Sequence, residues 1–289
     1  MKRLVRWVGG ALAVLALLLA GLLAVAWLDT DRAAKTVYRI DDPPLPPPGP
    51  EALARGAHLY ATRGCADCHG QDGAGREVMD AGPVGRMVAS NITPPALAER
   101  GYAAASIAAA IRHGVRADGT PLMFMPAGDW HDLDDADTAA LVAYLQAMPA
   151  ASQDPGRSEL RPLGWVLHLL GRLQPFPAAQ LDHSPRRRQA PTPAVSAEYG
   201  AYLAQTCTGC HGPQLRGGIQ HAPHLPVSTD LTPGHLGSWS EADFLTAMRE
   251  GKRPDGSAID SFMPWMSMRG MSDLELRALW AYLSSLPAG

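Results

Sequence analysis

The stretch Cys65-Ala66-Asp67-Cys68-His69 decides the fold of this 289-residue chain, and its pattern returns at Cys207-Thr208-Gly209-Cys210-His211. The two copies use all four cysteines. A Cys-x-x-Cys-His run is the attachment signature of c-type haem, because two thiols three residues apart lie on one helical face and the next residue, His, reaches the iron. The pattern predicts two covalent haem c groups, attached at Cys65, Cys68, Cys207 and Cys210, with His69 and His211 as iron ligands.

Two other uses of paired cysteines compete with haem attachment. A zinc site would need both pairs to converge on one metal and would not need a His beside each pair. A disulfide within each pair would leave the repeated His unexplained. Each pair lies in its own segment and is followed directly by His, so the pattern favours haem over both alternatives.

The sequence around the two motifs is also duplicated. Residues 51–149 and 196–288 share landmarks at offsets from 137 (Arg112 to Arg249) to 144 (Gly56 to Gly200). Further matched elements are Asn91-Ile92-Thr93-Pro94 with Asp230-Leu231-Thr232-Pro233, Met125-Pro126 with Met263-Pro264, and Ala143-Tyr144-Leu145 with Ala281-Tyr282-Leu283. So many aligned landmarks indicate an internal duplication and predict two tandem domains.

Both repeats are predicted to be helical. Residues 133–148 and 272–286 carry apolar side chains at three- and four-residue spacing, and Ser240 with Asp243 is typical of a capping box. Little in either repeat alternates with a period of two, so the predicted fold class is all-α.

Each iron needs a second ligand on its opposite face, and methionine is the best candidate. Met125 lies 56 residues after His69, and Met263 lies 52 residues after His211. A thioether ligand raises the reduction potential and closes the iron to small molecules. Only these two methionines align across the repeats, so they are the predicted axial ligands.

Other side chains could take that position. Met123 competes in the first repeat, and Met266, Met268 and Met271 compete in the second. Histidine is the other alternative, and the candidates are His113, His131, His221 and His224. None of these histidines has a clear counterpart in the other repeat, which weakens the case for a bis-histidine haem.

The N-terminus is predicted to be a membrane anchor. Residues 7–28 contain no charged side chain, and 22 residues in a helix span roughly 33 Å, enough to cross the hydrocarbon layer. Basic residues precede this run and acidic residues follow it, which places the body on the far side of the bacterial inner membrane, in the periplasm. A cleaved signal peptide, with Ala24-Val25-Ala26 as its site, is the alternative, and it would export the body equally.

The predicted division of the chain has five parts. They are a transmembrane anchor at 1–28, a Pro-rich spacer at 29–50, domain 1 at 51–149, a connector at 150–195 and domain 2 at 196–289. The prolines at 43–48 exclude a helix and suggest a stiff spacer that lifts the body off the membrane. The apolar residues 163–170 predict a short helix packed between or across the two domains.

The sequence allows more than one role for several other side chains. Arg112 and Arg249 occupy matched positions and could contact haem propionates, although a solvated helix face is the simpler explanation. Tyr144 and Tyr282 are expected to pack against haem or against the first helix of each repeat. Arg186-Arg187-Arg188 could steer an acidic partner, or could simply be charged surface.

These motifs resemble the cytochrome c subunits of bacterial membrane-bound alcohol, aldehyde and gluconate dehydrogenases. The resemblance covers residues 51–288 and includes Gly237-Ser238-Trp239-Ser240 with Asp243-Phe244, and Arg161 with Trp165 in the connector. It implies two tandem class I cytochrome c domains. The chain departs from that family in having two haem motifs where three are usual, and in having Arg100-Gly101-Tyr102 in place of the Gly-x-Trp-Ser element.

Electron transfer is the predicted function, rather than catalysis. A periplasmic or membrane-bound dehydrogenase subunit would be the donor, and quinone or a terminal oxidase the acceptor. The net charge of −3 gives no indication of nucleic-acid binding. The alternative is a dihaem enzyme such as a peroxidase or a thiosulfate-oxidising cytochrome, but a peroxidase needs an open iron face, against which the two matched methionines argue.

Overall fold

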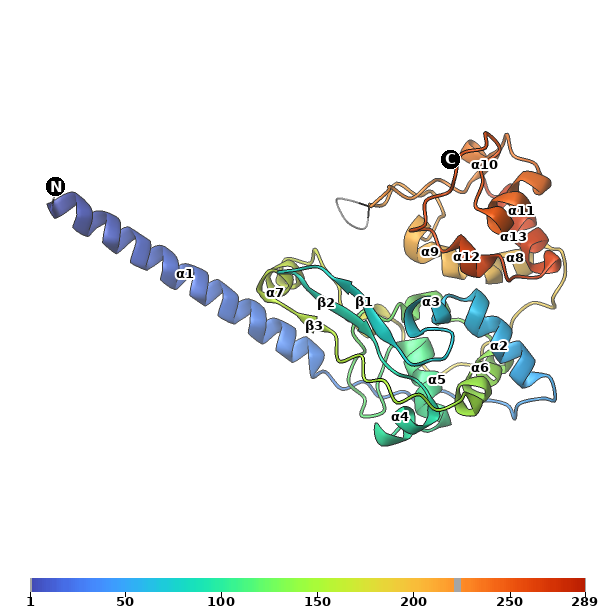
Figure 1. Ribbon diagram of the computed structural model, residues 1–289, viewed down its shortest axis with the longest axis horizontal. Coiled ribbons are helices and arrows are strands. Elements are labelled where there is room, and N and C mark those ends of the chain that lie inside the picture. The colour runs from blue at the N-terminus through green and yellow to red at the C-terminus, as the bar shows by residue number, and fades with distance from the viewer. Residues whose placement is uncertain (1, 221–224, 289) are drawn as a thin grey trace.

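The computed structural model describes residues 2–220 and 225–288. One long helix, α1 (Lys2–Ala34), leads into two small and mainly helical domains that contact each other (Figure 1). We call residues 51–149 domain 1 and residues 196–288 domain 2.

The two domains share one plan. Each opens with a helix that contains the matched glycine, continues into a short helix that contains the Cys-x-x-Cys-His motif, and closes with a helix that packs back on the first. In domain 1 the elements are α2 (Ala52–Thr62), α3 (Cys65–His69), α4 (Pro94–Glu99), α5 (Ala104–His113), the 3-10 helix η1 (Ala127–Trp130) and α6 (Asp135–Ala147). In domain 2 they are α8 (Ala197–Leu203), α9 (Gln205–His211), α10 (Pro233–Leu236), α11 (Glu241–Glu250), α12 (Trp265–Met268) and α13 (Asp273–Ser285).

The helix starts follow the sequence signals. Ser240 and Asp243 form the predicted capping box at α11, and Ser272 with Glu275 forms a second one at α13. Asp134 caps α6 by accepting hydrogen bonds from the amides of Ala136 and Asp137. Caps of this kind satisfy amide groups that have no partner inside the helix, so the helices predicted at 133–148 and 272–286 start within two residues of their expected positions.

The first and last helices of each domain cross at a glycine. A Cβ atom placed on Gly56 would collide with the Ala140 carbonyl oxygen, and one on Gly200 would collide with that of Ala278. Neither oxygen belongs to a flexible side chain, so the clash could be relieved only by moving a helix. The glycines therefore set the distance at which α2 packs on α6 and α8 packs on α13.

We expect Gly200→Val to destabilise the protein by about 3 kcal/mol, because overpacking would force the two helices apart. Ala54→Val is the matched control, since Ala54 lies on an exposed helical face and the substitution carries the same β-branched penalty in a helix. Guanidinium denaturation followed by far-UV circular dichroism measures both. Equal stability of the two variants would contradict the role of the glycine.

The all-α prediction needs a correction. Domain 1 contains a hairpin of β1 (Arg76–Asp80) and β2 (Gly85–Ala89), to which the connector adds β3 (Glu159–Leu160), giving an antiparallel sheet in the order β1-β2-β3. The hairpin follows α3 directly. Four of the five residues of β1 are exposed, so the strand has no alternating apolar face that the sequence could have revealed.

The Pro-rich segment, expected from the sequence to be a stiff spacer, packs against domain 1. It has no regular secondary structure and lies along domain 1, where the Tyr38 amide donates to the Gly119 carbonyl at 2.9 Å and Leu45 packs against the core. The helix α1 itself continues to Ala34, so the first residues assigned to the spacer are helical.

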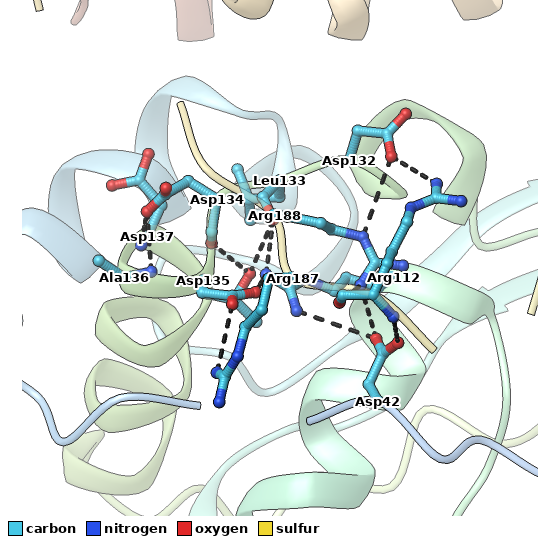
Figure 2. Close-up of polar contacts among 12 residues, drawn as sticks. Asp42, Arg112, Asp132, Leu133, Asp134, Asp135, Ala136, Asp137, Arg187 and Arg188 are labelled. Carbon is cyan, nitrogen blue, oxygen red and sulfur yellow. Dashed lines mark hydrogen bonds and ion pairs between the residues drawn. The ribbon is translucent and has the colours of Figure 1, made fainter. Parts of the chain in front are cut away.

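One carboxylate fixes this segment in place. Asp42 accepts a hydrogen bond from Arg188 at 2.6 Å and lies 3.0 Å from the Nε2 atom of His113. Arg112 lies beside them and donates to the Leu133 carbonyl and to Asp135 at 2.6 and 2.8 Å (Figure 2). We call Asp42, His113, Arg188 and Arg112 the Asp42 cluster. It ties the spacer and the connector to the end of α5.

The charge states in the Asp42 cluster follow from its burial. Burial alone would raise the pKa of the Asp42 carboxyl, but the hydrogen bonds from His113 and Arg188 outweigh it and leave the pKa below its usual value. Burial lowers the pKa of His113 to about 4, although Asp42 opposes the shift. At neutral pH the cluster therefore contains a charged Asp42 and a neutral His113.

Asp42→Asn should cost about 3 kcal/mol of stability, because it leaves the buried Arg188 without its counter-ion. The neighbouring Asp41 is exposed, so Asp41→Asn should change stability by less than about 0.5 kcal/mol. Urea denaturation at pH 7 gives both values, and limited proteolysis should cut within residues 36–48 faster in the Asp42 variant alone. Unchanged cutting would mean that the cluster does not fix the segment.

The connector forms the short helix that the sequence predicted, but in a different place. Helix α7 (Pro162–Leu169) packs against α1 and against the hairpin turn, not between the two domains. A second turn, the 3-10 helix η2 (Pro177–Gln180), follows it. Of the three consecutive arginines, Arg188 is buried in the Asp42 cluster, whereas Arg186 and Arg187 are more exposed and pair with Asp132 and Asp135.

Candidate haem sites

The four cysteines lie in the two short helices that the motifs predict, α3 and α9. None forms a disulfide, so the disulfide alternative is wrong. Burial raises the pKa of Cys65 to about 12 and that of Cys207 to about 11, which keeps both thiols protonated. Among the described residues there is no group of three or more His, Cys, Asp or Glu side chains that could hold a metal ion.

The two motif histidines are oriented in the same way. The Nδ1 atom of His69 lies 2.8 Å from the Ser90 carbonyl oxygen, and that of His211 lies 2.6 Å from the Thr229 carbonyl oxygen. A carbonyl oxygen only accepts, so Nδ1 carries the proton and Nε2 is the nitrogen suited to a metal. This arrangement fixes the ring orientation that an axial ligand requires.

The matched Asn-Ile-Thr-Pro and Asp-Leu-Thr-Pro stretches explain where those carbonyl groups come from. Ser90 and Thr229 each directly precede one of the stretches. The Asn91 side chain accepts from the Thr93 amide at 2.9 Å, and the Asp230 side chain accepts from the Thr232 amide at 2.8 Å. Each side chain locks a turn that points the preceding carbonyl at the histidine. The sequence identified these stretches as landmarks but gave them no role.

An apolar cavity in domain 2 brings the predicted haem residues together. It holds about 980 Å³ of empty space, partly continuous with solvent, and its lining includes Cys207, Cys210, His211, Met263 and Met268. Two thiols, one imidazole and a thioether within one apolar cavity are the donor set that haem c uses. The residues present therefore fit the group.

The structure narrows the choice of methionine. Met263 lines the cavity with His211, and Met268 is the one competitor that also lines it. Met266 is 57% exposed, and Met271 is buried in the core instead. In domain 1 both Met125 and Met123 are half-buried, and Met125 packs against the hydrophobic core.

Two of the four histidines considered as alternative iron ligands have other polar partners in the structure. His113 belongs to the Asp42 cluster, and His131 places Nδ1 at 2.9 Å from the Arg112 carbonyl. Both side chains are buried. His221 and His224 lie outside the described residues.

Arg112 and Arg249, considered from the sequence as contacts of haem propionates, each form an ion pair with an aspartate. Arg112 pairs with Asp135, and Arg249 pairs with Asp273 at 2.7 Å. Asp135 and Asp273 are matched residues at the starts of α6 and α13. Each arginine therefore joins the end of one helix to the beginning of the last helix, which is the same structural task in both domains. Tyr144 and Tyr282 pack against the first helix, beside Gly56 and Gly200, as expected.

The two domains meet through reciprocal contacts between their motif helices. Asp129 of η1 lies against Gly209 of α9, where a Cβ atom would be 2.7 Å from its Oδ1 atom. In return, Ser267 of α12 donates to Asp67 of α3 at 2.5 Å. Asp129 comes four residues after Met125 and Ser267 four residues after Met263, and both contact the middle of the other domain's Cys-x-x-Cys motif. The domains are thus related by an approximate two-fold axis.

The same reciprocity holds for the long helices. His58 of α2 lies 2.9 Å from Glu275 of α13, and Tyr202 of α8 donates to Asp137 of α6 at 2.8 Å. Arg55 bridges the two acids, at 2.8 Å from Asp137 and 3.4 Å from Glu275. Burial would raise the pKa of Glu275, but the hydrogen bonds of His58 and Ser272 lower it to about 2. The acid stays charged and keeps the domains together at neutral pH.

Asp129 should make stability depend on pH. Desolvation raises its pKa to about 7, so the folded chain holds this proton more tightly than the unfolded chain between pH 4 and 7. Its contribution is therefore favourable at low pH and is lost as pH rises through 7. We expect Asp129→Asn to be more stable than the parent by about 1–2 kcal/mol at pH 8 and equal to it at pH 4. Urea denaturation at both pH values tests this, and an equal difference at both would refute it.

Comparison with known proteins gives the family of both halves. Residues 51–145 match the family described as cytochrome c oxidase, cbb3-type, subunit III, and residues 197–287 match the family described as cytochrome c. The chain carries two cytochrome c domains. Their matched ranges coincide with the two repeats, and the predicted resemblance to dehydrogenase cytochrome subunits is confirmed.

Three relatives illustrate that resemblance. A nicotinate dehydrogenase subunit of Pseudomonas putida is 29% identical over 86% of this chain and 23% of its own length. The fructose dehydrogenase cytochrome subunit of Gluconobacter japonicus is 27% identical, over 82% and 53%. The cytochrome c subunit of alcohol dehydrogenase (quinone) of Gluconacetobacter polyoxogenes is 30% identical, over 81% and 56%. The chain thus spans about half the length of the latter two relatives and less than a quarter of the first.

Proposed function

We propose that this chain is a dihaem electron-transfer subunit that accepts electrons from a dehydrogenase and delivers them to the respiratory chain. The observation that carries the proposal is the reciprocal packing of the two motif helices at one interface, since it brings both attachment sites to the surface that the domains share. The names of the relatives, all subunits of dehydrogenases, support a dehydrogenase as the donor.

When bound, haem supplies the one-electron chemistry. The chain's part is to hold and tune it. Cys65 with Cys68, and Cys207 with Cys210, would form the thioether bonds. His69 and His211 would bind the iron through Nε2, and Met125 and Met263 would supply the thioether ligands. The largely apolar walls of the domain 2 cavity would place the group in surroundings of low polarity, which together with a thioether ligand raises the reduction potential.

We also propose that the chain is anchored in the inner membrane with its haem domains in the periplasm. Among the described residues one helix, α1, is long and apolar enough to span a bilayer, with a mean hydropathy of 2.7. Basic residues at its start and acidic residues after its apolar run favour this orientation. A quinone or a terminal oxidase would then be within reach as the acceptor.

The competing function is a dihaem enzyme such as a peroxidase or a thiosulfate-oxidising cytochrome. It needs one iron with an open or displaceable face. Carbon monoxide separates the two functions, because a reduced iron closed by histidine and methionine binds it poorly. We expect the reduced protein to show no rapid carbon monoxide binding at either haem, and rapid binding at one haem would favour the enzyme.

Paired leucine variants test the methionine assignment. Met263→Leu should abolish the sulfur-to-iron charge-transfer absorption of one haem in the oxidised protein and open that iron to carbon monoxide. Met268→Leu, which changes the same cavity, should leave both properties intact, and Met123→Leu is the equivalent control for Met125→Leu. Absorption spectroscopy with a potentiometric titration measures each variant. The reverse result, with Met268 essential and Met263 dispensable, would overturn the assignment in domain 2.

A further inference from the structure

Helix α7 is apolar around its whole circumference, yet it is poorly covered. Its sequence from Pro162 to Leu169 contains one polar side chain, His168, and its single buried residue is Gly164. Leu163 is 43% exposed, and Leu170, which follows the helix, is 63% exposed. A helix without a polar face is normally enclosed by protein or lipid. In water the exposed leucines would be unfavourable, so this surface requires a covering.

The position of α7 is fixed from two sides. On one side its backbone meets the hairpin turn, where the Leu163 amide donates to the Pro83 carbonyl at 3.1 Å and the Gly164 Cα lies against the Val84 carbonyl. On the other side it packs along the last turns of α1 (Figure 1). The α1 residues buried there are Ala26 and Thr30, and His168 lies 3.8 Å from Asp29. The leucines are therefore presented by a rigid support.

The contact with α1 indicates that membrane lipid covers the exposed leucines of α7. Ala26 and Thr30 flank the end of the uncharged run 7–28, so α7 lies at the level where that run meets polar sequence. Trp27 and Leu28 are 47% and 56% exposed on α1 beside it, and tryptophan favours the membrane interface. The exposed leucines of α7 thus belong to a helix that packs against the end of the segment proposed to span the bilayer.

We propose that α7 is an interfacial helix, which inserts Leu163 and Leu170 into the same bilayer leaflet that α1 leaves. This inference rests on the proposed membrane anchor and extends it. A single spanning helix would leave α1 and the body packed on it free to tilt together in the bilayer. A second contact, made by a helix that also holds the hairpin of domain 1, sets the height and tilt of that domain above the membrane.

Photo-crosslinking to lipid tests the inference on the full haem-loaded chain. The protein is reconstituted into phosphatidylcholine vesicles that contain a lipid with a diazirine on its acyl chain, irradiated and digested with trypsin. The run 7–28 then lies in peptide 7–32, and α7 lies in peptide 158–172. Peptide 270–277 serves as the internal reference, because it contains Leu274, which is 38% exposed on α13 of domain 2.

We expect lipid adducts on peptides 7–32 and 158–172 at least tenfold above those on peptide 270–277. The double variant Leu163→Glu/Leu170→Glu should lose the adducts on α7 and keep those on α1. The matched variant Leu274→Glu should change neither. Because the substituted side chains are exposed, haem content and circular dichroism should match the parent.

The outcomes separate this inference from the proposed anchor. Labelling of α1 without labelling of α7 overturns the interfacial helix and leaves the anchor in place, as it would if a partner protein covered α7. Absence of labelling on both peptides overturns the anchor as well. Equal labelling of peptide 270–277 would show that adduct formation does not report insertion, and would also count against the inference.

Discussion

The reciprocal contact between the two halves is the constraint on which the rest of the structure depends. Asp129 reaches the middle of one Cys-x-x-Cys motif and Ser267 reaches the middle of the other. Because the contact is reciprocal, both motif helices must lie at the same interface. Arg55, placed between Asp137 and Glu275, then satisfies both acids with one cation. Because these acids are matched residues of the two domains, Arg55 lies near the approximate two-fold axis and links both domains.

The two domains build their cores with few aromatic side chains. Aromatic residues make up 6% of the chain, and alanine and glycine are frequent in the helices. Close crossing at Gly56 and Gly200 lets the helices approach with few large side chains between them. In domain 2 there remains the apolar cavity lined by Cys207, Cys210, His211 and Met263. A covalently attached macrocycle fits the centre of such a domain and would stabilise it as a staple does.

Much of the helical architecture could be predicted from the sequence, because each feature of one repeat could be compared with its counterpart in the other. The helices at 133–148 and 272–286 and the capping box at Ser240 lie where the pattern placed them. The hairpin at 76–89 escaped prediction because β1 is exposed on both faces and carries no alternation. The ion pairs of Arg112 and Arg249 escaped prediction for another reason. Their partners, Asp135 and Asp273, lie 23 and 24 residues away along the chain, and no local pattern reveals such a pairing.

The segments outside the repeat were the least predictable, and they determine how the domains are mounted. Proline content excluded a helix at 43–48 but could not show that Asp42 would turn inward to meet Arg188 and His113. That meeting involves residues 71 and 146 positions apart in the sequence, and it arises only after domain 1 and the connector have folded. The Asp42 cluster and α7 both bind domain 1 to the segment that leaves α1, whereas domain 2 is held through domain 1 and the connector. The duplicated halves therefore share one helical plan but differ in placement, because only domain 1 is bound directly to the segment that leaves α1.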